Sequence, residues 1–228
     1  MFNLITKITP HRALLLVAML FLLLATVLAT SWGIAEVMVS QPRYLMQQWE
    51  QGKPLTTEDW QAAIDDMDLA MSLNNNNPEY SLDLARLYEW HALQQPLWTD
   101  HARTYRTHSI EHYRAATQLR PVWALAWINL AMTKTLNQQF DDEVAMAIEQ
   151  AMIYGQWEHG VHKKIIWLGL ATWNYLPEST QAKLLSFITK SLLAEHSVDF
   201  ISDTAKRFKW QQQLNAIKLD QQLEAQQG

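Results

Sequence analysis

The chain has 228 residues, no cysteine, six glycines and seven prolines, and 49% of its residues are hydrophobic. The lack of cysteine excludes disulfides and thiol chemistry, and the scarcity of glycine and proline predicts an all-α fold. Residues 33–228 carry 16 basic and 23 acidic side chains, a net charge of −7. This argues against nucleic-acid binding, because an acidic domain is repelled by a phosphate backbone.

The N-terminal segment predicts a membrane anchor. Residues 1–12 are basic and expected in the cytoplasm, and residues 13–32 contain no charge. About 20 apolar residues suffice for a helix to cross about 30 Å of hydrocarbon. Lys7 and Arg12 precede the span, so the main domain is expected on the far side of the inner membrane, in the periplasm. A signal peptide cleaved before Thr30 is the alternative, and it places the domain on the same side.

A helical domain is expected over residues 57–197, joined to the anchor by a juxtamembrane connection over 33–56. Its first helix is predicted by small and large residues that share one face: Ala63, Met67 and Ala70. Asn77-Pro78 then provides an N-cap with proline at the first helical position. The next helix is predicted by Leu84, Ala85 and Tyr88.

The stretch "HSIEHYRAATQLRP", residues 108–121, predicts a helix with Ser109, Tyr113 and Ala116 on one face. Pro121 ends it, because proline lacks an N–H and clashes with the preceding turn. The stretch before Ser109 is longer than a repeat of such helices permits. The extra residues are expected to lengthen both helices on either side of Pro96.

Three further helices follow. One is predicted by Trp127, Leu130 and Ala131; the next has Phe140 at the turn before it and Gly155 as its stop, with a face of Val144, Ile148 and Ala151. Leu168-Gly169 marks the third. Residues 198–228 are expected to form a capping helix with a Gln-rich tail, because terminal repeats need a polar outer face.

These patterns resemble three to four divergent tetratricopeptide (TPR) units between Thr57 and Leu193. Lys134 stands where a tyrosine is expected, and Gln156 where a proline is expected. The layout, with stretches such as "NPEYSLDLARLYEW" and "RPVWALAWINLA", also resembles the VpsP-type proteins encoded in bacterial exopolysaccharide clusters. That resemblance implies an accessory or scaffold role, with protein partners in the envelope polysaccharide machinery, and it leaves contact with the polysaccharide itself open.

Histidines are the first candidates for chemistry. His101, His108 and His112 share a helical stripe, and two histidines four residues apart can hold zinc. Glu111 lies off that stripe, unlike the glutamate of a zinc-protease motif. We therefore predict no metal here and expect these histidines beside the core on a solvated helix. His159 and His162 are expected to face solvent or to cap a helix.

Tryptophan could indicate sugar binding, since sugar faces stack on indole rings. Six positions come into question, although most are expected to pack in the core: Trp90, Trp98, Trp123, Trp127, Trp167 and Trp173. The basic stretch that begins at Ala205 could meet an acidic partner or the membrane, but a solvated face with Phe208 packed inward is expected. Acidic residues at the start of the first helix favour its positive end without catalysis: Asp65, Asp66 and Asp68.

No nucleophile–base pair or glycine-rich phosphate loop occurs in the sequence. We therefore predict a non-enzyme without catalytic residues, metal or cofactor, which acts by protein–protein binding as a scaffold in exopolysaccharide biosynthesis or export. Two alternatives remain open. One is a general periplasmic TPR adaptor or chaperone partner in secretion or cytochrome maturation, and the other is a polysaccharide-modifying enzyme with an unrecognised site.

Overall fold

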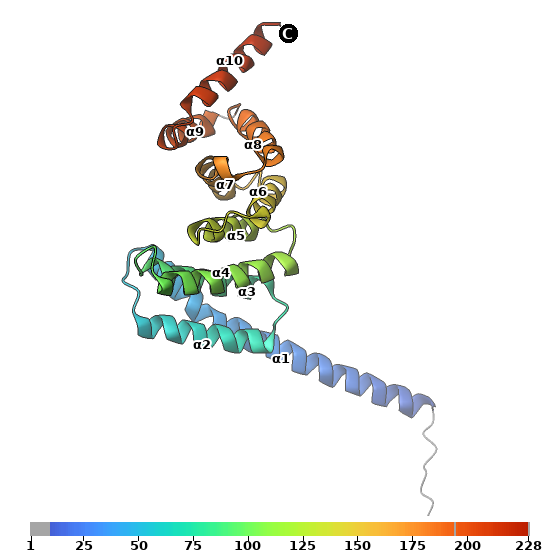
Figure 1. The fold of residues 1–228 in the computed structure, drawn as a ribbon. Helices are drawn as coiled ribbons and strands as arrows, with labels where there is room; N and C mark the ends of the chain where they lie inside the picture. Colours follow the sequence, from blue (N-terminus) through green and yellow to red (C-terminus); the bar gives the residue numbers. More distant parts are fainter. Residues whose placement is uncertain (1–9, 194, 228) are drawn as a thin grey trace, which may run out of the picture. The chain divides into compact units, whose positions relative to one another are not determined.

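The structure, a computed structural model, describes residues 10–193 and 195–227, and it is all-α over these ranges, as the composition predicts (Figure 1). The helices are α1 (Pro10–Glu50), α2 (Thr57–Leu73), α3 (Pro78–Leu93), α4 (Asp100–Leu119), α5 (Ala124–Leu136), α6 (Asp142–Tyr154), α7 (His159–Ala171), η1 (Trp173–Tyr175), α8 (Glu178–Ser191), α9 (Glu195–Arg207) and α10 (Gln211–Gln227). Most of the basic N-terminus expected over residues 1–12 lies outside the described residues.

The chain divides into two compact units, Met1–Tyr80 and Ser81–Gly228. The boundary falls inside α3, after its first turn. The sequence instead suggested one helical domain beginning at residue 57. The difference arises because α2 packs on α1 and thereby belongs to the first unit.

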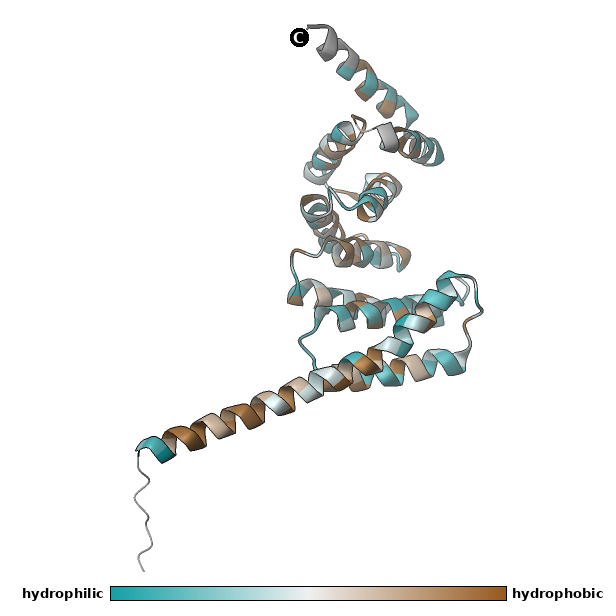
Figure 2. Cartoon of the chain, turned by 180° about the vertical axis from the view of Figure 1, so that it is seen from behind, coloured by the Kyte–Doolittle hydropathy of each residue, from teal (hydrophilic) through white to brown (hydrophobic). Residues whose placement is uncertain are grey.

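The first part of α1 has the length and composition of a membrane anchor or a signal sequence. Its residues from Pro10 to Thr30 are all exposed, and Figure 2 colours most of this part of the helix as hydrophobic, after a hydrophilic first turn. Among the described residues, α1 is the one helix long and apolar enough to cross a membrane. This agrees with the uncharged span that the sequence predicts at residues 13–32.

The second part of α1 forms an antiparallel pair with α2. Residues at alternating spacings of four and three are buried on α1: Ala35, Val39, Pro42, Met46 and Trp49. They face α2, whose Ala63, Met67 and Ala70 are buried as predicted. Ser31 Oγ donates to the carbonyl oxygen of Leu73 at 2.9 Å, which holds the end of α2 beside the middle of α1. The segment expected as a connection is therefore helical as far as Glu50.

Side chains at the helix ends account for several boundaries. Thr56, Thr99 and Asp141 each accept a hydrogen bond from the backbone N–H three residues later, at 3.1 to 3.3 Å, as N-caps do. Asn77 Oδ1 accepts from the N–H of Glu79 at 3.0 Å, and α3 begins at Pro78, which confirms the predicted N-cap. Gly155 follows α6 and its N–H bonds the carbonyl of Ala151 at 2.8 Å, as expected for a helix stop.

The second unit is a stack in which each helix packs on its neighbours. Helices α5, α6 and α7 each contact the next two α-helices, α8 contacts α9, and α10 packs on α9 (Figure 1). The predicted inner faces of α4, α5 and α6 lie in its core, with Trp127 half-buried and the other members buried: Ser109, Tyr113 and Ala116, then Leu130 and Ala131, then Val144, Ile148 and Ala151. Burying these side chains removes apolar surface from water, and this hydrophobic effect stabilises the stack of helices.

The extra residues before Ser109 lengthen helices, as predicted. Helix α3 has 16 residues and α4 has 20, whereas α5, α6 and α7 each have 13. Pro96 lies in the short segment between α3 and α4. Within residues 198–228, the chain completes α9 and forms α10, and Gly228 lies outside the described residues.

Candidate functional site

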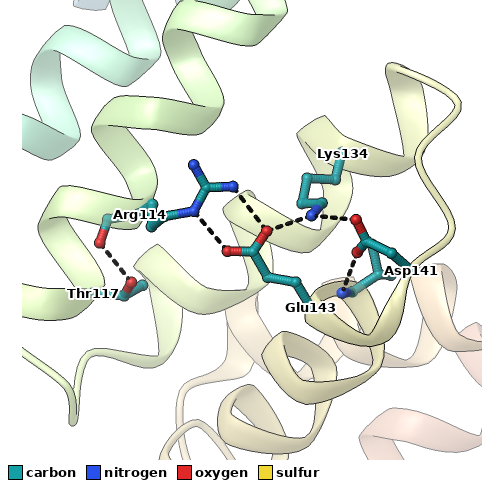
Figure 3. Close-up of polar contacts among 6 residues, drawn as sticks. Arg114, Thr117, Lys134, Asp141 and Glu143 are labelled. Atoms are coloured by element: carbon teal, nitrogen blue, oxygen red, sulfur yellow. Dashed lines mark hydrogen bonds and ion pairs between the residues drawn. The ribbon is translucent and has the colours of Figure 1, made fainter.

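A charged network connects α4, α5 and α6 (Figure 3). Arg114 on α4 donates from Nε and Nη2 to the two carboxylate oxygens of Glu143 on α6, at 2.7 and 2.8 Å. Lys134 on α5 donates to the same carboxylate and, at 2.7 Å, to Asp141. The network thus holds two cations against two carboxylates across three helices.

The charged groups of this network are paired with one another and hold α4, α5 and α6 together. The hydrogen bonds from Arg114, with the charge of Lys134, lower the pKa of Glu143 to about 2, so its carboxylate is ionised at neutral pH. The same pairing raises the pKa of Arg114 above its usual range. Lys134 is only 3% exposed, and a buried ammonium is tolerated only when it is paired. The sequence had placed Lys134 as a departure from the repeat pattern; the structure shows a buried cation there, held by two carboxylates.

A second polar tie runs from α3 to α4 and α5. Glu89 accepts from the hydroxyl of Tyr113 at 2.8 Å and from Thr133 Oγ1 at 3.0 Å. Burial raises the pKa of Tyr113 well above its usual range, and the neighbouring Glu89 acts in the same direction. The phenol therefore keeps its proton and remains a donor. This contact positions three helices rather than a reacting group.

The histidine stripe of α4 lies against α3. His101 and His108 are exposed, while His112 is half-buried and stacks on Tyr88, with ring centroids 5.5 Å apart. His101 and His108 thus lie on the solvated side of α4, and His112 lies at the border of the core, where α3 partly covers it. No group of three side chains suited to hold a metal ion occurs among the described residues. Metal binding by these histidines has not been measured, and the absence of a metal here stays a prediction.

A hollow of the second unit lies where the α6–α7 turn meets α7, α8 and α9. Its volume is about 360 Å³, and its aromatic lining is Phe187 with Trp157, whose indole is 89% exposed. Its polar lining comes from four different elements: Gln156, His159, His162, Lys190, Ser191 and Ser197. A volume of this size falls within the range of about 300–1,000 Å³ that is typical of small-molecule sites.

A second hollow of about 300 Å³ adjoins the first along α6 and α8. The two share Gln156, Phe187 and Lys190, and the second adds Glu149, Met152, Ile153, Lys183 and Ser186. We call the two together the α8 trough. Lys183 pairs with Glu149 at 2.6 Å, so this carboxylate and this ammonium neutralise each other.

The α8 trough contains two residues that the sequence singled out and one that it missed. His159, which is exposed, and His162, which is half-buried, both line the first hollow. Trp157 was not among the tryptophans considered, although its place between Gly155 and Gly160, in a turn between two helices, signals exposure.

Most of the tryptophans considered from the sequence do pack. Four are half-buried against the core: Trp123, Trp127, Trp167 and Trp173. Trp90 is half-buried as well, and Trp98 is exposed. Phe208 packs edge-on against Trp167, with ring centroids 5.5 Å apart, which agrees with its expected inward position.

No protein-family model matches the chain, and no curated protein matches it significantly in sequence.

Proposed function

We propose that this chain is a membrane-anchored scaffold whose stacked helices bind a protein of the bacterial machinery that makes or exports a surface polysaccharide. The observation that carries the proposal is the packing of the second unit, in which α5, α6 and α7 each contact the next two α-helices. Repeat arrays built in this way present extended surfaces of equivalent helices, and they act by binding protein segments or surfaces.

The helix pairs α3–α4, α5–α6 and α7–α8 are, in this proposal, divergent TPR units. Small residues lie at the buried contacts where such units need close approach: Ala116, Ala131 and Gly169. A Cβ atom placed on Gly169 would lie 2.4 Å from a methyl carbon of Leu184, so α7 and α8 approach closely at this point. The resemblance to VpsP-type proteins supports the polysaccharide machinery as the setting.

The anchor belongs to the same proposal. Helix α1 continues without a break from Pro10 through Thr30 to Glu50, and its second part packs on α2. An uncleaved α1 would therefore join the membrane span rigidly to the first unit. The basic residues Lys7 and Arg12 support a cytoplasmic N-terminus and a periplasmic domain.

Reporter fusions test this topology. An alkaline phosphatase that is active only outside the cytoplasm, fused after Gly228, is expected to be active in cells. A fluorescent protein that fails to mature in the periplasm after this kind of export, fused at the same position, is expected to stay dark. If the phosphatase fusion were inactive and the fluorescent-protein fusion were fluorescent, the C-terminal domain would lie in the cytoplasm and the proposed orientation would be wrong. An N-terminal epitope tag retained on the membrane-bound product shows that α1 is not cleaved.

Deletion and complementation test the function. Cells that lack the chain are expected to lose cell-surface polysaccharide. The full-length chain restores it, whereas a version released into the periplasm by a cleavable signal peptide does not, because a scaffold must stay at the membrane. Unchanged polysaccharide in the deletion strain, combined with altered protein secretion or cytochrome content, would contradict the proposal and favour a general periplasmic adaptor.

A further inference from the structure

The α8 trough combines an apolar surface with many hydrogen-bonding side chains. Six of the eight side chains that line its first hollow are polar, and they come from the α6–α7 turn, α7, α8 and α9. Hydroxyl, amide, imidazole and ammonium groups offer many donors and acceptors in a small volume. A ligand that satisfies them must itself carry polar groups in several directions.

The aromatic member of the hollow is available to a ligand. Trp157 is 89% exposed, and its indole offers a flat apolar face beside the polar lining. Ile153 and Tyr154, at the end of α6, are also exposed. A flat indole next to converging hydrogen-bonding groups matches a pyranose ring, which has an apolar C–H face and a rim of hydroxyls.

The hydrogen-bonding groups within the hollow are partly oriented in advance. Ser191 Oγ donates its hydrogen to the carbonyl of Phe187 at 2.7 Å. Nε2 of His162 must therefore be the donor in its 2.8 Å contact with Ser191 Oγ. This contact links α7 to α8 and fixes the imidazole ring at the wall of the hollow, so that a ligand meets a rigid surface.

The charge of the hollow selects the kind of sugar. Among the described side chains that line it, Lys190 is the one ammonium group and none is a carboxylate. Among the described residues, Lys190 forms no ion pair, whereas Lys183 in the adjoining hollow is neutralised by Glu149. Within an exported region of net charge −7, this is a local positive site, and it favours a carboxylate-bearing ligand.

We infer that the α8 trough binds an acidic saccharide, with a sugar ring stacked on Trp157 and its carboxylate held by Lys190. The two adjoining hollows offer room for more than one sugar residue, which fits a stretch of a polymer. This inference deepens the proposed function by adding direct contact with an acidic polysaccharide to the binding of proteins. The choice of polymer rests on that function, but the binding itself can be measured without it.

Calorimetric titration of the purified full-length chain in detergent tests the inference. Trigalacturonate and a hyaluronan tetrasaccharide are the acidic probes, and cellotriose is the neutral probe of similar size. At least one acidic probe is expected to bind, more weakly as salt rises, and the neutral probe at least about tenfold more weakly, because it lacks the carboxylate that Lys190 would hold.

Matched variants locate the binding. Trp157→Ala and Lys190→Gln are each expected to weaken binding of the acidic probe by about tenfold or more. Trp98→Ala and Lys206→Gln remove another exposed indole and another exposed ammonium outside the trough, and they should leave affinity unchanged. Both trough positions line the surface, so the variants are expected to fold, and their thermal unfolding midpoints verify this.

Several results would overturn the inference: no binding of either acidic probe, equal affinity for cellotriose, or undiminished binding by Trp157→Ala. Binding of an acidic peptide that competes with and exceeds the saccharides would instead make the trough a peptide site. These outcomes are independent of the deletion experiment. A normal polysaccharide level with intact saccharide binding would contradict the proposed function but not the site.

Discussion

Gly155→Ala is expected to destabilise the second unit more than any other glycine-to-alanine change in it. A Cβ atom at this position would lie 2.5 Å from Cγ1 of Val161, 2.8 Å from Cβ of Ala124 and 2.9 Å from the carbonyl oxygen of Ala151. The last two atoms are backbone or directly attached to it, so they cannot rotate away. The φ of Gly155 is −108°, so the cost comes from crowding and not from the backbone conformation.

Overpacking of this kind costs about 1–3 kcal/mol, and we expect a value near the upper end. For a unit of this size, each kcal/mol lowers the unfolding midpoint by about 2–4 °C. Thermal unfolding of the full-length chain in mild detergent, followed by circular dichroism, should therefore show a midpoint lowered by about 5–10 °C.

Two other glycines provide the comparison. Gly160 lies in the first turn of α7 with open space around its Cα, so Gly160→Ala is expected to be neutral or slightly stabilising, because alanine favours a helix. Gly169→Ala should fall between the two, because the atoms in its way belong to the flexible end of Leu184. If Gly160→Ala proved as destabilising as Gly155→Ala, close helix approach at Gly155 would not be the cause.

Glu143→Gln is expected to have the largest effect among charge changes. The variant places an NH₂ group against Arg114 or Lys134, both of which are donors, and it leaves the buried Lys134 with Asp141 alone. Breaking a buried ion pair costs about 3–5 kcal/mol, and the partial exposure of Glu143 places the expected loss at about 2–3 kcal/mol. Asp203→Asn is the matched control, because its pair with Lys206 is exposed and such pairs contribute about 0–1 kcal/mol.

The same carboxylate predicts a pH dependence. The pKa of Glu143 falls from its ordinary 4.5 to about 2 in the folded state, so its contribution is complete above pH 4.5. As the pH falls from 4.5 towards 2, the unfolded state binds the proton first and the stabilisation is lost. Urea unfolding at several pH values should show this acid limb in the natural chain and a flatter one in Glu143→Gln. An unchanged acid limb in the variant would assign the pH dependence to other carboxylates.

The sequence alone determined several helix boundaries and the inner faces of α2, α4 and α6. Asn77-Pro78, Pro121 and Gly155 act within one or two turns of their own positions, so their effects can be deduced without knowing the neighbouring helices. The buried set of Ser109, Tyr113 and Ala116 follows in the same way from the helical period. The hydrophobicity of residues 13–32 depends only on composition, and α1 has this composition in the structure as well.

Only the tertiary structure decided which helices meet. The buried residues of α1 from Ala35 to Trp49 pack on α2. From the sequence, the same segment was expected to be only a connection between the anchor and the helical domain. His112 is stacked because α3 covers it, and Lys134 is buried because α4 and α6 bring Arg114 and two carboxylates around its position. The α8 trough combines residues between Glu149 and Ser197 from five elements. Such features depend on contacts between residues far apart in the chain, and local helix periodicity carries no information about them.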